Sequence, residues 1–354
     1  MEPLPSVQPP PAATMPTAVT PAQTVLKALG IIVKTAARLW FSCASLIGSL
    51  FLIFILGTAF FFFTHSDQAQ SDKVLSGAGP DKIAVIPLSG EIDEAASTSS
   101  LLSGPANTIT PDLVQGYIDR ASTDQYVKAV IFRLNSPGGT IVASDQIYDK
   151  IASLKDKKIK VIFLYGDVAA SGGYYISSAA DKIVANPTTI TGSIGVIASV
   201  LNVSGLYDKL GLKDETYKSG KNKDLLNPAR ERTQEEKDII QKLINQALDQ
   251  FIDRVASGRN LDKAKVRQIA DGRIYSGIDA KSLGLVDELG NLDKAVEVAK
   301  KEANLNNPQV VEYSEPSLIQ SLLGGKIGNL NLLSIFNSSP TPSSGIKIEY
   351  LLNF

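Results

Sequence analysis

A serine followed by two glycines is the first candidate for chemistry in this sequence. Ser171 follows an apolar run and opens a stretch of small residues, ASGGYYISS. At such a turn a hydroxyl can project beyond the end of a strand, and the N–H groups of the next helix point to the same place, which suits a developing oxyanion. Gly172 and Gly173 would leave room for a substrate backbone. The alternative is an N-cap serine followed by glycines that only allow close packing.

A second glycine pair ends another apolar run. The sequence Asn-Ser-Pro-Gly-Gly at 135–139 precedes a predicted helix that begins near Ile141. A Pro-Gly-Gly turn can aim a backbone N–H of Gly138 or Gly139 into the space beyond the strand, where acyl transfer needs hydrogen-bond donors. An ordinary tight turn is the alternative. Two such turns at the ends of adjacent strands favour a common site.

A nucleophilic serine needs a base, and the candidates are few. The single histidine, His65, lies far along the chain from the serine, at a predicted membrane boundary. A lysine can serve instead, although its ordinary pKa of about 10.4 would have to fall by roughly 3 for work near neutral pH. Desolvation and neighbouring positive charge can lower it. Residues 216–228 contain Lys218, Lys221 and Lys223, and residue chemistry alone does not select one of them.

Composition excludes several other classes of site. The one cysteine, Cys43, allows no intrachain disulfide and no cysteine metal cluster, and a single histidine argues against the common zinc sites. Acidic and basic residues number 36 and 35, for a net charge of −1, which argues against a nucleic-acid binder. We therefore expect no metal, no cofactor and no nucleic-acid partner.

The elements that must position these residues alternate along the chain. Buried or alternating patterns predict strands over 82–92, 127–136, 159–167 and 181–197, and periodic patterns predict helices over 111–124, 141–155, 171–180, 233–258, 261–270, 277–283 and 291–303. Thr233 and Glu236 form a capping box, and the apolar stripe that follows is typical of core or of a subunit interface. Residues 346–352 could form a last edge strand. This order predicts an α/β domain with a largely parallel sheet and a site at the strand ends.

The N-terminal part of the sequence predicts a membrane anchor. Residues 1–38 include a proline-rich tail, and residues 39–64 carry no charge. A helix of 26 residues would reach about 39 Å, more than the ~30 Å hydrocarbon core. A cleaved signal peptide is the alternative, but the run is too long for it and no small-residue cleavage site follows. The basic residues before the run, Lys27, Lys34 and Arg38, predict a cytoplasmic N-terminus and an extracytoplasmic remainder.

Four motifs in order resemble the signal peptide peptidase A family in its short, single-domain form. They are Asn-Ser-Pro-Gly-Gly (135–139), Ala-Ser-Gly-Gly-Tyr-Tyr (170–175), Thr-Gly-Ser-Ile-Gly-Val (191–196) and Lys-Ser-Gly-x-x-Lys-Asp (218–224). The resemblance spans roughly 80–305. It implies the repeated β-β-α superhelical fold shared by the caseinolytic protease and the crotonases. The implied domain layout is a tail over 1–38, a transmembrane helix over 39–64, a linker over 65–80, the peptidase domain over 81–305 and an extension over 306–354.

The resemblance also implies a role for each motif. Ser171 would be the nucleophile and Lys223 the general base, with Ser193 holding that lysine. Gly138 and Gly139 would line the oxyanion hole, to which the helix start at Gly172 would add a donor. The family further implies a homo-oligomer whose serine and lysine can come from adjacent subunits.

These inferences lead to one main hypothesis and two alternatives. The main one is a Ser-Lys endopeptidase, anchored by a single pass in a bacterial-type cytoplasmic membrane, that degrades hydrophobic peptides such as cleaved signal peptides. The first alternative is a catalytically inactive oligomeric membrane scaffold of the same fold, against which the intact Ser171 and Lys223 argue. The second is a crotonase-like acyl-CoA enzyme, which would normally use carboxylates for acid–base work.

Overall fold

A computed structural model describes residues 34, 48–58, 72–95, 108–314 and 348–351, and the chain divides into two units, Met1–Ser71 and Asp72–Phe354. In the first unit, residues 48–58 are helical. They lie inside the predicted membrane span over 39–64, and the rest of that span falls outside the described residues, as does His65. Among the helices that the structure describes, none is both long and apolar enough to cross a membrane.

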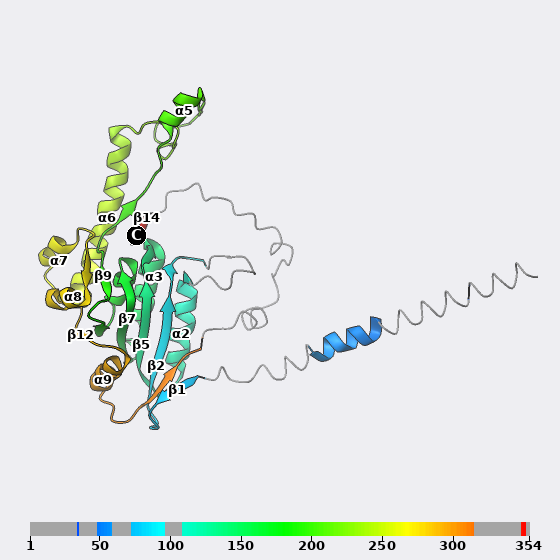
Figure 1. Cartoon of the computed structure of the whole chain (residues 1–354), viewed down its shortest axis with the longest axis vertical. Coiled ribbons are helices and arrows are strands. Elements are labelled where there is room, and N and C mark those ends of the chain that lie inside the picture. The colour runs from blue at the N-terminus through cyan, green and yellow to red at the C-terminus, as the bar shows by residue number, and fades with distance from the viewer. Residues whose placement is uncertain (1–33, 35–47, 59–71, 96–107, 315–347, 352–354) are drawn as a thin grey trace, which may run out of the picture. The chain divides into compact units, whose positions relative to one another are not determined.

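The second unit contains a mixed sheet in which parallel pairing dominates (Figure 1). In its described part nine strands join, in the spatial order β1 (Lys73–Ser76), β13 (Gln309–Glu312), β2 (Lys82–Ser89), β5 (Val127–Ser136), β7 (Lys160–Ala170), β8 (Lys182–Ala185) and β12 (Glu288–Leu289), with β9 (Ile190–Gly192) beside β7 and β11 (Ile274–Ser276) beside β9. The predicted α/β class with a largely parallel sheet is confirmed. The sheet also takes in β1, from the predicted linker, and β13, from the predicted C-terminal extension.

A smaller sheet brings the C-terminal strand to the glycine-rich turn of 135–139. Its described strands, in order, are β10 (Ile197–Ala198), β14 (Ile348–Leu351), β6 (Gly138–Thr140), β3 (Glu91–Ile92) and β4 (Thr108–Ile109). The strand predicted over 346–352 is therefore present, but it is not an edge strand. It pairs with β10 on one side and β6 on the other, because the short strands at both sides leave their backbone groups free to pair with it.

Every helix predicted for the peptidase domain is present, with bounds within three residues of the prediction. They are α2 (Pro111–Thr123), α3 (Ile141–Ala152), α4 (Gly172–Ser177), α6 (Gln234–Arg259), α7 (Lys263–Ile269), α8 (Gly277–Leu283) and α9 (Leu292–Glu302). The predicted capping box starts α6, since the side chain of Thr233 accepts from the N–H of Glu236 and the carboxylate of Glu236 accepts from the N–H of Thr233. The short helix α5 (Ser204–Leu210) was not predicted.

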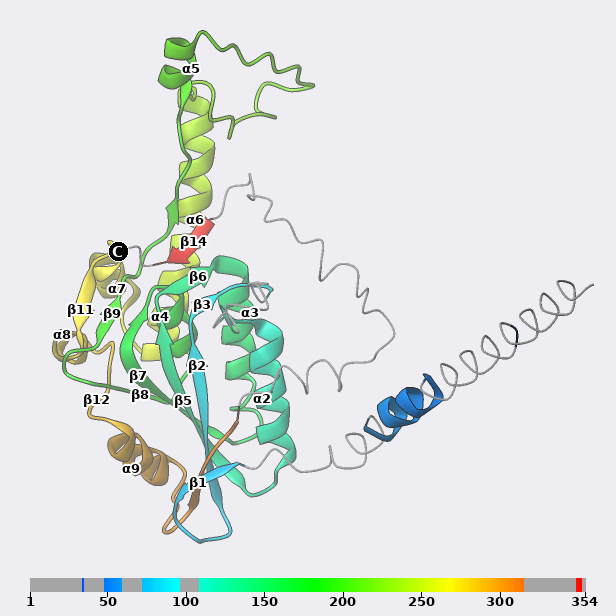
Figure 2. The same ribbon diagram turned by 45° about the vertical axis from the view of Figure 1, so that its right-hand side comes forward.

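Alternation along the strands explains why helices cover both faces of the large sheet. In β2, Ala84 and Ile86 pack in the same cluster as buried residues of α2, α3 and α4. Ile83 and Val85 face the opposite way and pack with residues of α9. Figure 2 shows α2 and α3 on one side of the strands and α9 on the other. Because both faces are buried, the strands read as nearly continuous apolar runs.

Helix α6 carries a projecting segment, residues 199–232, which we call the arm. The C-terminal half of α6 is anchored in the core by its buried residues Phe251, Ile252 and Val255. The N-terminal half extends beyond the sheet, and Figures 1 and 2 both show α5 and the rest of the arm at the far end of this helix. The arm exposes apolar side chains, with Leu201 75% and Tyr217 92% accessible.

Candidate active site

Ser171 lies at a sharp turn between β7 and α4. Its backbone has φ 53° and ψ −116°, a conformation that residues with a side chain rarely adopt. Two hydrogen bonds hold it there: its N–H donates to the carbonyl of Gly192 (2.8 Å), and the N–H of Tyr175 donates to its carbonyl (2.8 Å). Only 1% of the residue is accessible. The turn therefore holds one hydroxyl in a fixed place at the carboxyl end of β7.

The two glycine turns meet at this place. β5 and β7 are parallel neighbours, as predicted, so the turn that follows β5 and the turn that follows β7 lie at one edge. A Cβ added at Gly138, where φ is +108°, would lie 2.7 Å from the amide nitrogen of Gly172. A Cβ at Gly172 would lie 3.1 Å from the amide nitrogen of Gly139. A side chain at either position would thus fill the space between the two turns, and glycine keeps it open.

A peptide strand of the chain itself lies against these turns. β14 runs antiparallel to β6, with Tyr350 paired to Gly139 and Leu351 to Gly138. The carbonyl oxygen of Tyr350 would lie 2.1 Å from a Cβ added at Gly138 and 3.1 Å from one added at Gly172. The carbonyl oxygen of Tyr350 therefore occupies the space between the two turns. It lies close to Gly172, the residue that follows Ser171.

The side chain of Tyr350 fills an aromatic pocket. It is fully buried, its ring stacks on Tyr175 (centroids 5.0 Å apart) and packs on Phe251 (4.7 Å), and its hydroxyl donates to the carbonyl of Ala247 (2.8 Å). Burial raises the pKa of the Tyr350 hydroxyl well above its ordinary value, so the ring stays neutral in this pocket. A groove that accepts an aromatic side chain is consequently built next to the glycine turns.

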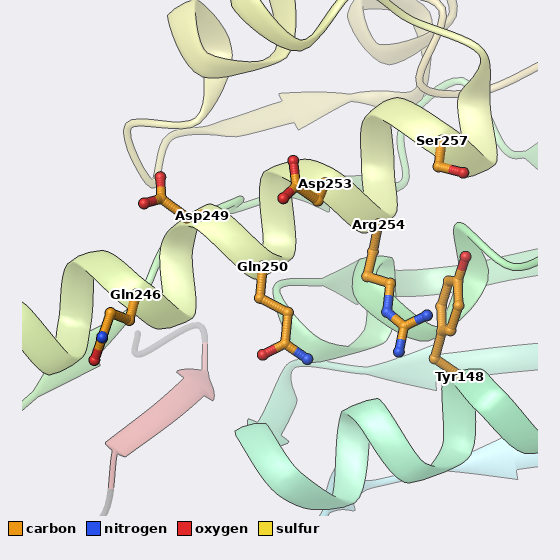
Figure 3. A pocket seen from close by; sticks show the side chains of 7 residues that line it. All are labelled: Tyr148, Gln246, Asp249, Gln250, Asp253, Arg254 and Ser257. Carbon is orange, nitrogen blue, oxygen red and sulfur yellow. The ribbon is translucent and has the colours of Figure 1, made fainter.

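An ion-paired network supports the outer wall of this pocket. The hydroxyl of Tyr175 donates to Asp145 (2.6 Å), and the guanidinium of Arg254 donates to the same carboxylate (2.8 Å). Arg254 also lies over the ring of Tyr148, 4.2 Å from its centroid, as Figure 3 shows from the side of α6. Arg254 and Tyr148 also line a separate open hollow of about 580 Å³. None of the residues predicted for the site lines this hollow. The network fixes the wall that Tyr175 presents to Tyr350.

Ser193 lies beside Ser171 at the same edge. β9 pairs with β7 so that Gly192 lies opposite Ala170. Ser193 follows Gly192 and Ser171 follows Ala170, so the two serines leave the sheet side by side. Ser193 also has a positive φ, 50°, and only 6% of it is accessible. Its N–H donates to the carbonyl of Arg273 (2.8 Å). The predicted supporting serine is thus placed near the predicted nucleophile within one chain.

Lys223, in contrast, lies on the arm. The structure places it in a turn of the exposed loop between α5 and α6, and no hydrogen bond links it to Ser171 among the described residues. Its two neighbours in the motif are ion-paired: Lys218 contacts Asp224 (2.6 Å) and Lys221 contacts Glu235 (2.7 Å). No such ion pair of the Lys223 ammonium is present in the described part of the chain. Of the three candidate bases, Lys223 is the one whose amine is not committed to a carboxylate.

Several residues of the site were not predicted from the sequence. Tyr350 and Phe251 belong to segments that were predicted only as a strand and a helix. Asp145 and Arg254 lie on α3 and α6 and were not singled out. Tyr175 belongs to the quoted Ala-Ser-Gly-Gly-Tyr-Tyr motif, where its aromatic ring next to the glycines was the available signal. The others meet through contacts between distant segments, which no local pattern reveals.

The chain is similar to known peptidases. The model of Peptidase family S49 matches residues 153–306, and that of Clp protease matches residues 102–193. A protein of Enterococcus faecium named "putative signal peptide peptidase SppA" is 40% identical over 267 residues, covering 75% of this chain and 77% of that protein. The chain belongs to peptidase family S49. The resemblance inferred from the four motifs is confirmed.

Two further relatives of this S49 peptidase are longer than it is. "Serine protease SPPA, chloroplastic" of Arabidopsis thaliana is 38% identical over 68% of this chain and 35% of its own length. "Protease 4" of Haemophilus influenzae is 35% identical over 66% of this chain and 37% of its own length. The S49 match contains Ser171, Ser193 and Lys223, and the Clp protease match contains both glycine turns. The α/β domain is therefore that of a Clp-protease-like serine peptidase.

Proposed function

We propose that this S49 peptidase is a membrane-anchored endopeptidase that uses Ser171 as nucleophile and Lys223 as general base. One observation carries the proposal. An extended peptide strand, β14, already lies on β6 with its Tyr350 carbonyl oxygen between the two glycine turns. A substrate that pairs with β6 in the same way would bring its own carbonyl to the same place. Strand addition of this kind binds peptides through their main chain and leaves specificity to side-chain pockets.

The proposed chemistry follows from that pose. The Ser171 oxygen attacks the carbonyl carbon as its proton passes to the neutral amine of Lys223. The carbonyl oxygen becomes negative and accepts hydrogen bonds from backbone N–H groups of the Gly138–Gly139 turn and of Gly172. When the intermediate collapses, the departing amine takes the proton from Lys223. Water then attacks the acyl group on Ser171 by the same steps, and the carboxylic acid product leaves.

The proposed base reaches the nucleophile from a second copy of the chain. Lys223 belongs to the arm, which Figures 1 and 2 show at the end of α6 that extends away from the sheet, whereas Ser171 directly follows β7. The exposed apolar side chains of the arm, such as Leu201 and Tyr217, are typical of a surface that another protein covers. In a homo-oligomer the arm of one copy would deliver Lys223 to Ser171 of its neighbour, where Ser193 would accept or donate a hydrogen bond to hold it.

The substrate class follows from the pocket and from the sequence of the first unit. The aromatic pocket that holds Tyr350 favours large apolar side chains before the scissile bond. Hydrophobic peptides, such as signal peptides released at the membrane, meet this requirement. Residues 39–64 would anchor the enzyme by one pass in a bacterial-type cytoplasmic membrane, with the peptidase domain outside the cytoplasm.

Covalent labelling tests this function. A fluorophosphonate probe should label the purified full chain in detergent, and Ser171→Ala should abolish both labelling and hydrolysis of a signal-peptide substrate. The side chain of Ser171 makes no capping hydrogen bond to α4, so its removal costs no cap and the variant should remain folded. Ser282→Ala, at an exposed serine on α8, is the matched control and should be labelled like the wild type. Wild-type turnover by Ser171→Ala would remove Ser171 from the mechanism.

A further inference from the structure

An ionic cluster ties the loop of Lys223 to the start of α6. Arg230 donates to both carboxylate oxygens of Asp224, at 2.9 and 2.8 Å, and to both of Glu236, at 2.9 and 2.6 Å. It also donates to the backbone carbonyls of Asp224 and Glu231, each at 3.0 Å. Every nitrogen of the guanidinium therefore has a partner. Paired bidentate bonds of this kind fix geometry as well as charge, because the guanidinium is planar.

The two carboxylates belong to different parts of the chain: Glu236 to the helix α6, which is anchored in the core, and Asp224 to the loop of Lys223. The side chain of Glu236 is 2% accessible and closes the capping box of α6, whose other half is buried in the core. The side chain of Asp224 is 11% accessible, directly follows Lys223, and also pairs with Lys218. Arg230 thus joins Asp224, the residue next to Lys223, to α6, whose C-terminal half is buried in the core.

The cluster is balanced in charge. Lys218 and Arg230 carry two positive charges, which offset the two negative charges of Asp224 and Glu236. Other charged side chains in ion pairs or hydrogen bonds near this loop include Lys221, paired with Glu235, Asp214, which accepts from Asn227 and Thr216, and Glu231, which accepts from Asn202. Without Arg230, the carboxylate of Asp224 would pair with Lys218 alone, and the ionic link from Asp224 to Glu236 would be lost.

The carboxylates of the cluster keep their charge wherever the enzyme would work. Hydrogen bonds from Arg230 hold the pKa of Asp224 well below its ordinary value and that of Glu236 at about 2. A lowered pKa in the folded state means that the cluster contributes stability fully above the ordinary value of 4.5 for Glu236, and loses it as the pH falls toward 2. Between pH 6 and 10 neither carboxylate titrates, so any change in activity there reports another group.

We infer that Arg230 is a positioning residue for the general base: it holds the Lys223 loop on α6, so that Lys223 is presented to Ser171 of the neighbouring copy in one fixed geometry. This inference rests on the proposed function. It assigns to Arg230 a geometric effect, which should change kcat and leave KM nearly unchanged.

The test compares two substitutions of Arg230 in the full chain. Arg230→Met should lower kcat for a signal-peptide substrate by roughly 10- to 100-fold, the cost of a misplaced catalytic group, with little change in KM. Arg230→Lys, which keeps one charge but not the fork, should also lose kcat. Added methylguanidinium should partly restore Arg230→Met.

A matched control removes another arginine ion pair on α6. Arg267→Met breaks the exposed pair with Asp249 and should leave both kcat and KM near wild type. If Arg230→Met lowers activity only by unfolding or by dissociating the oligomer, with a wild-type kcat in the remaining active fraction and no rescue, the inference is wrong. Should Arg230→Met fail to fold, a wild-type kcat in Arg230→Lys overturns the geometric role.

Lys223→Ala, measured alongside, separates this inference from the proposed function. An inactive Lys223→Ala with a normal Arg230→Met would refute the role of Arg230 alone. Full activity in Lys223→Ala would refute Lys223 as the base, and Arg230 would then have no base to position.

Discussion

Ser171 combines an almost fully buried position with a backbone conformation that costs about 1–3 kcal/mol for a residue with a side chain. The hydrogen bond to Gly192 and the turn into α4 maintain that strain. The same turn keeps the amide of Gly172 next to Gly138 and Gly139. A serine that served only as a helix cap would not need this conformation, since caps have ordinary extended backbones. At this scale the geometry favours a positioned nucleophile.

The base can be tested by one substitution that keeps its charge. Lys223→Arg should be as inactive as Lys223→Ala, because arginine stays protonated at every working pH. Lys218→Arg and Lys221→Arg should retain much more activity, since each keeps the charge that pairs with Asp224 or Glu235. Turnover of the three arginine variants between pH 6 and 10 checks this. Activity in Lys223→Arg, with loss in one of the others, would assign the base to a different lysine.

At the scale of elements, β14 is the least expected contributor to the site. It completes the smaller sheet between β10 and β6 and places an aromatic side chain in the pocket of Tyr175 and Phe251. If substrates bind to β6 in the same way, they must compete with this strand.

Deletion of residues 348–354 tests that competition. The shortened chain should bind a signal-peptide substrate with a several-fold lower KM, because the groove is free. A synthetic peptide of the sequence IKIEYLLNF should then inhibit it competitively, and the same peptide with alanine for Tyr350 should inhibit far less, since the aromatic packing is worth about 1 kcal/mol or more. Thermal unfolding would be recorded for both chains. If deletion abolishes activity and the added peptide restores it, β14 is a structural strand and not a stand-in for substrate.

The elements themselves could largely be predicted, whereas their partners could not. Apolar runs and periodic stripes revealed β2, β5, β7 and, in the described part of the second unit, the helices other than α5, whose seven residues carry no buried side chain to leave a pattern. The two glycine turns were recognisable because their residue types are unusual at strand ends. The pairing of β14 with β6 and the bonds of Arg230 join segments far apart in the sequence, so neither leaves a local signal. The short strands β1 and β13 were missed because four residues give little periodicity.

At the scale of the whole molecule, the anchor proposed for residues 39–64 determines on which side of a membrane the peptidase domain would lie. The basic residues Lys27, Lys34 and Arg38 predict that the segment after residue 64 is extracytoplasmic. A reporter enzyme that is active only outside the cytoplasm, fused after residue 80, should therefore be active, and a reporter that works only in the cytoplasm should be silent at the same junction. The opposite pattern would reverse the topology and remove the argument for extracytoplasmic substrates.

The central claim is a site made by two copies of the chain, with Ser171 from one and Lys223 from the other. The most direct measurement mixes two inactive variants, Ser171→Ala and Lys223→Ala, under conditions in which subunits exchange, and records hydrolysis of a signal-peptide substrate. Random assembly of equal amounts gives about one quarter of sites with both residues intact, so roughly a quarter of wild-type turnover should return. Mixed oligomers, verified by two affinity tags, that stay as inactive as the separate variants would contradict the shared site.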